Sequence, residues 1–378
     1  MTDDVPLFEI PWSREEVQNA LDSITRGSYW ANGPYVDAFE EGIESFLGVE
    51  HAVVFNSGTT ALASALRAHG IGPGDEVVVP SFTFVATANA VRLVGADPVF
   101  ADVERDRYGL DPESVREVAT DRTEAVVPVH YAGTPCRIDD LAEVARAEDL
   151  VLVEDAAEAF GATLDGTPVG TFGDSAMLSF CQNKVVATGE GGAVVTDDAD
   201  LAADLRLLRS HGRASGEYFE SSGGGEYRAL GNNLRMPDVV AAVGVGQLDR
   251  VEELIAGRRR VASEYADRLA QIEGVEPIPD PPGGRHVYQL YSVTFDPEID
   301  RDSVVETLAD RGIASKIYFE PVHESTYYWE TYEKPVEHLP VTEELSERVL
   351  SLPMHPELST AEIDRVADAL ADAVERAR

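Results

Sequence analysis

The stretch HAVVFNSGTTAL, residues 51–62, joins a short apolar run to a glycine turn and then to a helix that begins at about Thr59. Six similar runs follow along the chain: EVVVP (76–80), DPVFAD (97–102), EAVVPVH (124–130), LVLVED (150–155), SAMLSF (175–180) and GGAVVT (191–196). Helical patterns lie between the earlier runs, at 59–69, 84–94, 112–119 and 137–147. Continuous β-branched strands that alternate with helices are typical of a mainly parallel sheet covered on both faces. The sequence therefore predicts an α/β fold with a large seven-stranded sheet.

The segments outside this sheet predict a second, smaller domain. Two helices precede the first strand, one opened by the capping box of Ser13 and Glu16 and the other over 34–47. After residue 197 we expect a helix at 198–209, a mobile Gly/Ser-rich loop at 216–227, a long helical stretch at 237–272, a strand at 287–295, a helix at 302–311 and a last helix after the capping box that starts at Ser359. We therefore place N-terminal helices and the large domain in 1–250, and a long connecting helix with a small α+β domain in 251–378.

The charge of the chain says little about its function. Asp and Glu number 69 against 30 Lys and Arg, which gives a net charge of −39, and the acid is spread over the whole sequence. An even spread with only three lysines favours a halophilic surface, hydrated and screened by salt, over an acidic site for a cationic partner. Nucleic-acid binding is disfavoured because phosphate contacts need clustered cations.

Other classes are disfavoured by what the sequence lacks. No stretch approaches the roughly 18 apolar residues of a membrane span, and the acidic N-terminus has no signal pattern, so we expect a cytoplasmic protein. The two cysteines are far apart, and the eight histidines are scattered without ligand-like spacing. These patterns predict neither a disulfide framework nor a metal site.

The turn after the first run, FNSGTTAL at 55–62, predicts an anion site. A helix that begins near Thr59 presents free N–H groups and the positive end of its dipole, and the threonine hydroxyls add donors. A phosphate fits this arrangement. An ordinary helix cap by Ser57 or Thr59 explains the same residues equally well.

The stretch LVLVEDAAEAFGA at 150–162 delivers Asp155 at the end of a buried strand. Ligands bind at this end of the strands in open α/β sheets, and an aspartate there can pair with a protonated ring nitrogen. The alternative is an aspartate that caps a helix. Glu158, three residues on, either shares the pocket or faces solvent.

The stretch SFCQNKVVATGEGGAVVT at 179–196 places Lys184 between a strand that ends at Ser179 and a glycine-rich reversal. A lysine in a buried turn is costly unless it is used, and burial makes a lysine a candidate for Schiff-base chemistry. The alternative, a surface lysine with a packed stem, fits poorly in a chain that otherwise avoids lysine.

The stretch PSFTFVATANA at 80–90 puts Phe82 and Phe84 just after a strand, where either ring could stack on a flat heteroaromatic ligand or belong to the core. A phosphate site, an acid for a ring nitrogen, a stacking aromatic and a Schiff-base lysine together describe pyridoxal 5′-phosphate (PLP). The joint pattern is far more specific than any one of its parts.

The order of the sequence blocks resembles the nucleotide-sugar aminotransferases of the DegT/DnrJ/StrS family, which have the fold-type-I aminotransferase architecture. The resemblance covers nearly the whole chain, in the blocks GPYVDAFEEGIESFLG (33–48), NSGTTAL (56–62), GDEVVVPSFTFVATANAV (74–91), VEDAAEAFGA (153–162), SFCQNKVVATGEGGAVVT (179–196), GNNLRMPDVVAAVGVGQL (231–248) and LPMHPEL (352–358). It implies that Lys184 holds the cofactor and shuttles a proton, that Asp155 meets the pyridine nitrogen and that Phe84 stacks on the ring. Two positions depart from the usual pattern, which has Gln or His at Glu158 and His at Cys181, and the change at Glu158 bears on the cofactor hydroxyl.

The resemblance also implies how the phosphate is held and how the chain assembles. Gly58, Thr59 and Ser179 match positions that bind the phosphate. Asn233, in GNNLR, resembles a residue that reaches the phosphate from the neighbouring subunit. The family pattern thus implies a homodimer with a shared active site.

The expected reaction transfers the amino group of an amino acid, by analogy L-glutamate, to a keto sugar linked to a nucleoside diphosphate. The DAAEA and Asn-Lys spellings are similar to perosamine-synthase-like members, which aminate a 4-keto-6-deoxy sugar on GDP; a 3-keto sugar is the alternative. Tyr318 and His323, in IYFEPVHE (317–324), either contact the substrate or only pack between domains. Two rival functions are a PLP-dependent sugar dehydratase, disfavoured because those relatives carry histidine at the lysine position, and a non-catalytic sugar-nucleotide-binding or regulatory protein, disfavoured by the intact pair of Asp155 and Lys184.

Overall fold

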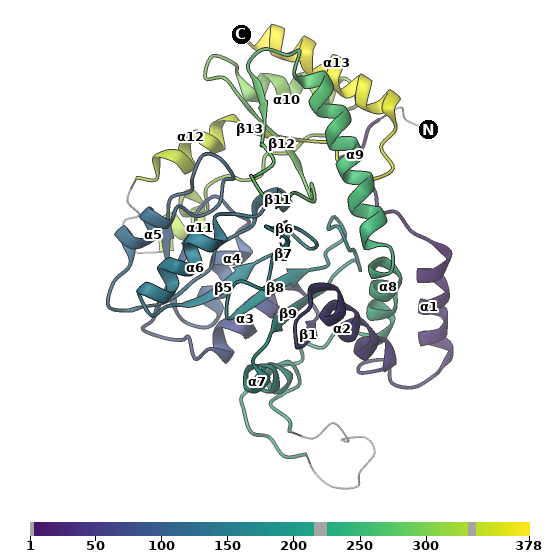
Figure 1. Cartoon of the computed structure of the whole chain (residues 1–378), viewed down its shortest axis with the longest axis vertical. Coiled ribbons are helices and arrows are strands. Elements are labelled where there is room, and N and C mark those ends of the chain that lie inside the picture. The colour runs from purple at the N-terminus through teal and green to yellow at the C-terminus, as the bar shows by residue number, and fades with distance from the viewer. Residues whose placement is uncertain (1–3, 215–224, 332–337) are drawn as a thin grey trace.

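The computed structural model describes residues 4–214, 225–331 and 338–378 of the chain (Figure 1). Most of the Gly/Ser-rich loop that we expected at 216–227 therefore lies outside the described residues. Within the described ranges, no helix has the length and apolar character that would let it cross a membrane.

A seven-stranded sheet forms the centre of the large part of the molecule, as the sequence predicts (Figure 1). Its strands, in spatial order, are β1 (His51–Phe55), β9 (Gly192–Thr196), β8 (Ser175–Ser179), β5 (Val151–Asp155), β4 (Thr123–Val126), β2 (Glu76–Pro80) and β3 (Asp97–Ala101). Neighbours from β8 to β3 run parallel, and β9 runs antiparallel to both β1 and β8. The carboxyl ends of five neighbouring strands therefore share one edge of the sheet.

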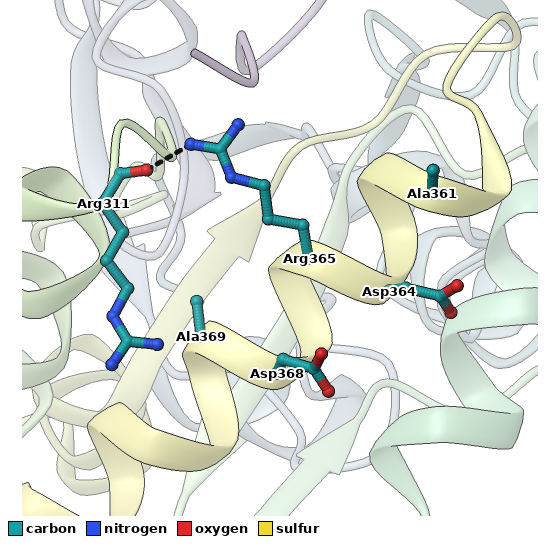
Figure 2. Close-up of a pocket in the computed structure, with 6 residues that line it drawn as sticks. All are labelled: Arg311, Ala361, Asp364, Arg365, Asp368 and Ala369. Atoms are coloured by element: carbon teal, nitrogen blue, oxygen red, sulfur yellow. Dashed lines mark hydrogen bonds between the residues drawn. The ribbon is translucent and has the colours of Figure 1, made fainter. Parts of the chain in front are cut away.

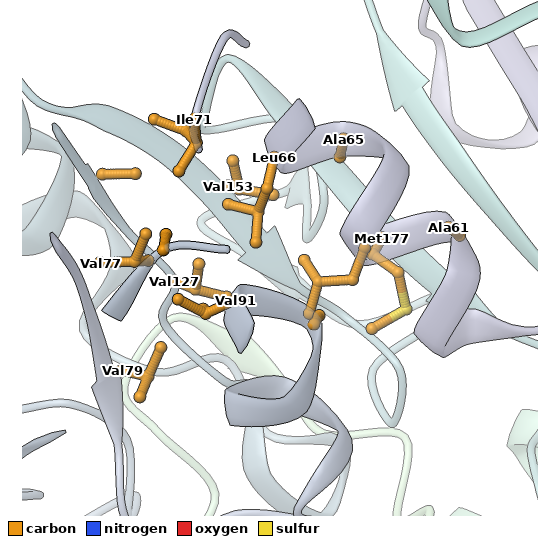
Figure 3. Packing of buried hydrophobic residues seen from close by; sticks show 14 of the residues in the cluster. Ala61, Ala65, Leu66, Ile71, Val77, Val79, Val91, Val127, Val153 and Met177 are labelled. Atoms are coloured by element: carbon orange, nitrogen blue, oxygen red, sulfur yellow. The ribbon is translucent and has the colours of Figure 1, made fainter. Parts of the chain in front are cut away.

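Alternating side chains of the buried strands pack into different helix layers. Val77 and Val79 of β2 lie in a core with α3 (Gly58–Ala68) and α4 (Ala86–Leu93), which Figure 3 shows. Val78 lies instead in a core with α5 (Pro112–Val118) and α6 (Ile138–Ala147). Since both faces are covered by helices, the strands must be apolar throughout, and this explains their unbroken apolar runs.

The two N-terminal helices, α1 (Arg14–Thr25) and α2 (Pro34–Leu47), pack on α8 (Asp238–Leu248). The first of them, α1, begins with the expected capping box of Ser13 and Glu16. Both α2 and α7 (Ala199–Arg209), which follows β9, also contact β1 of the sheet. Gly246 of α8 lies against α1, because a Cβ there would meet backbone and side-chain atoms of Glu16 at 2.9–3.2 Å. The absence of a side chain at Gly246 therefore brings these two helices close together.

The long helix that we expected at 237–272 is two helices, α8 and α9 (Val251–Leu269). Helical geometry is lost at Arg250, whose φ and ψ are −111° and 8°. The side chain of Arg250 there pairs with Glu16 of α1 and Glu253 of α9. The break lets α8 pack against α1 and α2 while α9 runs toward the C-terminal core (Figure 1). The domain boundary expected after residue 250 remains a prediction.

A second core is built on a small antiparallel sheet with the order β10 (Val275–Pro277), β12 (Tyr291–Phe295) and β13 (Val349–Leu352). It is covered by α9, α10 (Arg301–Asp310) and α13 (Thr360–Ala377), and α13 begins with the expected capping box of Ser359 and Glu362. The strand expected at 287–295 starts only at Tyr291. The reason is that the N–H groups of Val287 and Leu290 donate to the carbonyls of Gly133 and Ala132, outside this sheet.

Short elements complete the described chain. They are β6 (Thr163–Leu164), β7 (Thr167–Pro168) and β11 (Gly284–Arg285), which form a third sheet, the 3-10 turns η1 (Tyr131–Gly133) and η2 (Val322–Glu324), and the helices α11 (Thr326–Thr331) and α12 (Pro340–Arg348). The turn η1 follows β4 and lies beside residues 287–290 through the two backbone hydrogen bonds just described. This contact joins the large sheet to the C-terminal core.

Candidate active site

The first turn of α3 lies against the end of β8 at the carboxyl edge of the sheet. A Cβ on Gly58 would lie 3.3 Å from the hydroxyl oxygen of Ser179, and a Cβ on Gly192 would lie 2.6 Å from the backbone nitrogen of Gly58. Ser57 caps the helix by accepting the N–H of Thr60 at 3.2 Å. No acceptor for the N–H groups of Gly58 and Thr59 is found within the described part of the chain. Free N–H groups at a helix start beside a hydroxyl form a cradle for an anion.

Asp155 ends β5 and is almost fully buried at the same edge. Its carboxylate accepts hydrogen bonds from the hydroxyl of Thr87 at 2.8 Å and from the N–H of Ala157 at 3.1 Å. Burial raises the pKa of Asp155, and the two hydrogen bonds and the charge of Lys184 oppose that rise. A carboxylate in this setting is stabilised by a cationic partner such as a protonated ring nitrogen.

Lys184 lies in the turn after β8 and points into the protein. Its side chain is 13% exposed, and its Nζ donates to Oε1 of Glu158 at 3.3 Å. The other carboxylate oxygen of Glu158 accepts the N–H of Ala132 in η1 at 2.8 Å. Of the two alternatives for Glu158, the structure shows the shared pocket, and the surface alternative for Lys184 is wrong because the amine is turned toward buried carboxylates.

The two candidate aromatic residues have different environments. Phe82 is fully buried and packs against Tyr108 and Tyr131, so it belongs to the core. Phe84 precedes α4 and is 59% exposed, with the ring of Phe319 centred 6.2 Å away. An aromatic ring with an open face is available for stacking on a ligand, whereas a core ring is not.

Asn233 is exposed and forms an isolated antiparallel β-bridge with Ser210. The next residue, Leu234, accepts the N–H of Asn56, which lies two residues before Gly58. The segment around Asn233 therefore runs next to the anion cradle at the start of α3 in its own chain. Its expected contact with a neighbouring subunit remains a prediction.

The two candidate substrate residues, Tyr318 and His323, have different surroundings. The carbonyl of Tyr318 accepts the hydroxyl proton of Tyr131 in η1, the turn that also holds Glu158, and burial and the nearby charge of Glu158 raise the pKa of the Tyr318 phenol. His323 is buried, and its Nδ1 lies 2.6 Å from the hydroxyl of Ser81, which also accepts the backbone N–H of His323 at 3.1 Å. These bonds give His323 a packing role, and contact of either residue with substrate remains a prediction.

Two contributors to the site were not expected from the sequence. Thr87 donates to Asp155 from the first turn of α4, and the N–H of Ala132 in η1 holds Glu158. Threonine inside a helical pattern carries no distinctive signal. A backbone N–H carries none at all, so neither could have been found without the fold.

A surface hollow elsewhere in the molecule contains none of these residues (Figure 2). It lies between the end of α10 and α13 and is lined by Arg311, Ala361, Asp364, Arg365, Asp368 and Ala369. Its arginines are engaged within the chain, because Arg365 donates to the carbonyl of Arg311 and Arg311 pairs with Asp372 at 2.7 Å. The hollow is therefore no competitor to the site around Lys184.

PLP fits the residues gathered at the edge of the sheet. The helix start at Gly58 and the hydroxyl of Ser179 offer an anion cradle, Asp155 offers a buried acid, Phe84 offers an open ring and Lys184 offers an inward-facing amine. These are the four kinds of group that PLP chemistry requires.

Known proteins resemble the chain over nearly its full length. The profile of the DegT/DnrJ/EryC1/StrS aminotransferase family matches residues 11–371. GDP-perosamine synthase of Caulobacter vibrioides is 41% identical over 341 residues, covering 89% of this chain and 90% of that protein. The structure of DesV from S. venezuelae, in complex with a ketimine intermediate, is 36% identical with a TM-score of 0.90 and full coverage of both chains. A PLP-form structure of the putative sugar aminotransferase Spr1654 from Streptococcus pneumoniae is 25% identical with a TM-score of 0.93, covering 99% of this chain and all of that one.

The fold, the cofactor groups and the sequence match agree with one another. The expected fold-type-I architecture and the expected cofactor are both confirmed. The chain belongs to the DegT/DnrJ/EryC1/StrS aminotransferase family and is a PLP-dependent aminotransferase.

Proposed function

We propose that this enzyme transfers an amino group from L-glutamate to a keto sugar carried on a nucleoside diphosphate, for the biosynthesis of a glycan or polysaccharide. The similarity to GDP-perosamine synthase favours a 4-keto-6-deoxy sugar on GDP as the acceptor. The observation that carries the proposal is the inward-facing amine of Lys184, which lies 3.3 Å from Glu158 at the sheet edge that also holds the buried carboxylate of Asp155.

We assign roles to the residues from their positions. Asp155 would hold the ring nitrogen of PLP, and Gly58, Thr59 and Ser179 would hold its phosphate. Bound there, PLP supplies an electron sink that stabilises negative charge at the carbon that bears the amine. Lys184 would carry the proton between that carbon and the cofactor as general base and then general acid. Glu158 keeps the amine of Lys184 directed into the site.

The direct test uses the colour of the bound cofactor and the turnover of the enzyme. The purified protein should absorb visible light, and borohydride should remove that absorption and add the mass of the reduced cofactor to the peptide that contains Lys184. Lys184→Ala should abolish the amination of GDP-4-keto-6-deoxy sugars with L-glutamate, read by mass spectrometry. Lys316→Ala, which changes an exposed lysine, is the matched control. Full turnover by Lys184→Ala would refute the assignment.

We further propose that the enzyme works as a homodimer. Val17, Leu21 and Ile24 form an apolar stripe on α1, and each is at least half exposed. Trp12 and Trp30 extend this patch and are exposed by more than half. These exposed apolar side chains on a chain of charge −39 are suited to a second copy, because apolar side chains buried against each other leave water without bringing carboxylates together.

The patch is connected to the loop that we expect to reach the neighbouring site. The carbonyl of Trp30 accepts the N–H of Asp238, five residues beyond Asn233. Leu21→Glu should yield a monomer in sedimentation equilibrium and lose activity, whereas Leu93→Glu, on the exposed part of α4, should change neither. A fully active dimer with glutamate at position 21 would contradict this interface.

We infer salt adaptation from the spread of acid over the chain. At low ionic strength, 69 carboxylates against 30 cations repel one another, and salt screens that repulsion. The melting temperature should therefore rise from 0.1 M to 2 M KCl. A melting temperature that does not depend on salt would remove the inference.

A further inference from the structure

The segment 287–290 touches both supports of Lys184. On one side, the N–H groups of Val287 and Leu290 donate to the carbonyls of Gly133 and Ala132, and the N–H of Ala132 holds Glu158. The fit is tight, because a Cβ on Gly133 would lie 2.7 Å from the side chain of Val287. We call residues 287–290 the strap, since they connect the C-terminal core to the site.

On the other side, the strap reaches the lysine turn through a single side chain. Nε2 of Gln289 donates to the carbonyl of Asn183, the residue before Lys184, at 2.5 Å. Gln289 is almost fully buried, and no donor within the described ranges reaches its Oε1. Burying an unsatisfied oxygen costs free energy that an apolar residue would avoid. The bond to the lysine turn is therefore the side chain's evident contribution.

The strap itself is held in an uncommon backbone conformation. Tyr288 has a φ of +50°, which side chains other than glycine rarely adopt. Two neighbouring arginines of α9 hold this backbone by hydrogen bonds. Arg258 donates to the carbonyls of Tyr288 and Gln289 at 3.2 and 3.3 Å, and Arg259 donates to the carbonyl of His286 at 2.7 Å. A strained residue persists only where its surroundings enforce it, and such residues cluster at functional sites.

We propose that Gln289 is a positioning residue for Lys184. The strap fixes the backbone at Asn183 and the carboxylate of Glu158 together, so the lysine stem and the acceptor of its amine keep one geometry. This proposal rests on the assigned role of Lys184. It adds that the C-terminal core, through Gln289, determines where the amine points.

The test compares Gln289→Met, which keeps the shape and removes the donor, with Thr294→Val, which removes a part-buried hydrogen bond from β12 to the carbonyl of Glu276 and leaves the lysine turn untouched. Because the chain has only three lysines, trace acetylation of the cofactor-free protein followed by peptide mass spectrometry reads Lys184 directly, with Lys316 as internal reference. Borohydride fixation of the cofactor to Lys184 in the wild type checks the underlying assignment separately.

We expect Gln289→Met to change the labelling rate of Lys184 relative to Lys316 several-fold and to lower kcat by about 10- to 100-fold, with a smaller change in KM for the amino donor. Thr294→Val should lower the melting temperature about as much as Gln289→Met does. It should leave the labelling rate of Lys184 and kcat unchanged. Gln289→His, whose Nε2 can occupy the position of the glutamine nitrogen, should restore them. If Gln289→Met does not fold, Gln289→Glu takes its place.

Equal labelling and kcat in Gln289→Met and Thr294→Val would overturn the proposal, as would failure of Gln289→His to restore either readout. Failure of borohydride to fix the cofactor at Lys184 would instead overturn the proposed role of the lysine, so the two failures can be told apart.

Discussion

Glu154 and Asp155 are neighbours on β5, both buried, yet their surroundings differ. Glu154 accepts the N–H groups of Gly170, Phe172 and Gly173 and the Nε2 proton of His130, at 2.7–3.0 Å. The tautomer follows from geometry, because the N–H of Cys136 donates to Nδ1 of His130 and leaves the ring proton on Nε2. Four donors from this face of the strand satisfy the Glu154 carboxylate.

Asp155 faces the ligand edge, and within the described ranges only Thr87 and the N–H of Ala157 donate to it. A buried carboxylate is thus available for function when the protein leaves some of its hydrogen-bonding capacity unused. A carboxylate with all its hydrogen bonds made holds a loop in place, and one with unused hydrogen-bonding capacity retains affinity for a cationic ligand. The comparison yields four predictions.

The largest effect is expected from Asp155→Asn. The amide cannot stabilise a protonated ring nitrogen, so kcat/KM should fall about a thousandfold while the protein still folds. Steady-state kinetics with L-glutamate, together with circular dichroism, measure both. Near-normal turnover would remove Asp155 from the cofactor site.

Glu154→Gln should show the opposite pattern. Its NH₂ group would face backbone or imidazole donors, so the free energy of unfolding should drop by about 3 kcal/mol, whereas kcat of the folded enzyme should change only a few-fold. Denaturant unfolding at neutral pH measures the loss. If activity fell as far as in Asp155→Asn without loss of stability, the contrast between the two acids would be wrong.

Thr87→Val should weaken PLP binding about tenfold, because it removes one of the two donors that favour the charged form of Asp155. The cofactor Kd can be measured by titrating the cofactor-free protein. Thr134→Val is the control, since the hydroxyl of Thr134 is buried and has no partner within the described residues. A similar loss of affinity in both variants would indicate a general effect of packing.

The smallest effect concerns pH and the cofactor-free protein. Burial raises the pKa of Asp155 above its value of 3.8 in the unfolded chain, so the ionised group destabilises the folded state at neutral pH. This penalty is relieved as the pH falls through the folded pKa, and it is gone below 3.8. Asp155→Asn should therefore be more stable than the wild type at pH 7, with an advantage that shrinks toward pH 4. Thermal unfolding across this range measures the difference, and a constant advantage would contradict the assignment.

Most of the large domain could be predicted because its signals are local. The strands from β1 to β9 that form the central sheet are continuous apolar runs, and the capping boxes at Ser13 and Ser359 mark helix starts within four residues. The break between α8 and α9 and the late start of β12 could not be predicted. In both cases distant partners, such as Glu16 for Arg250 and η1 for the strap, compete with the local pattern.

The chemical groups of the enzyme and its family could be read from the amino-acid sequence alone, because residue types and their spacing along one strand or turn are encoded locally. How those groups are used depends on the folded chain. The fold gives Glu154 and Asp155 different hydrogen-bond partners and turns Lys184 toward Glu158. It also brings Gln289 to Asn183, which is 106 residues away in the sequence. Burial and hydrogen bonding are properties of the packed surroundings, and these come from segments that are far apart in the sequence.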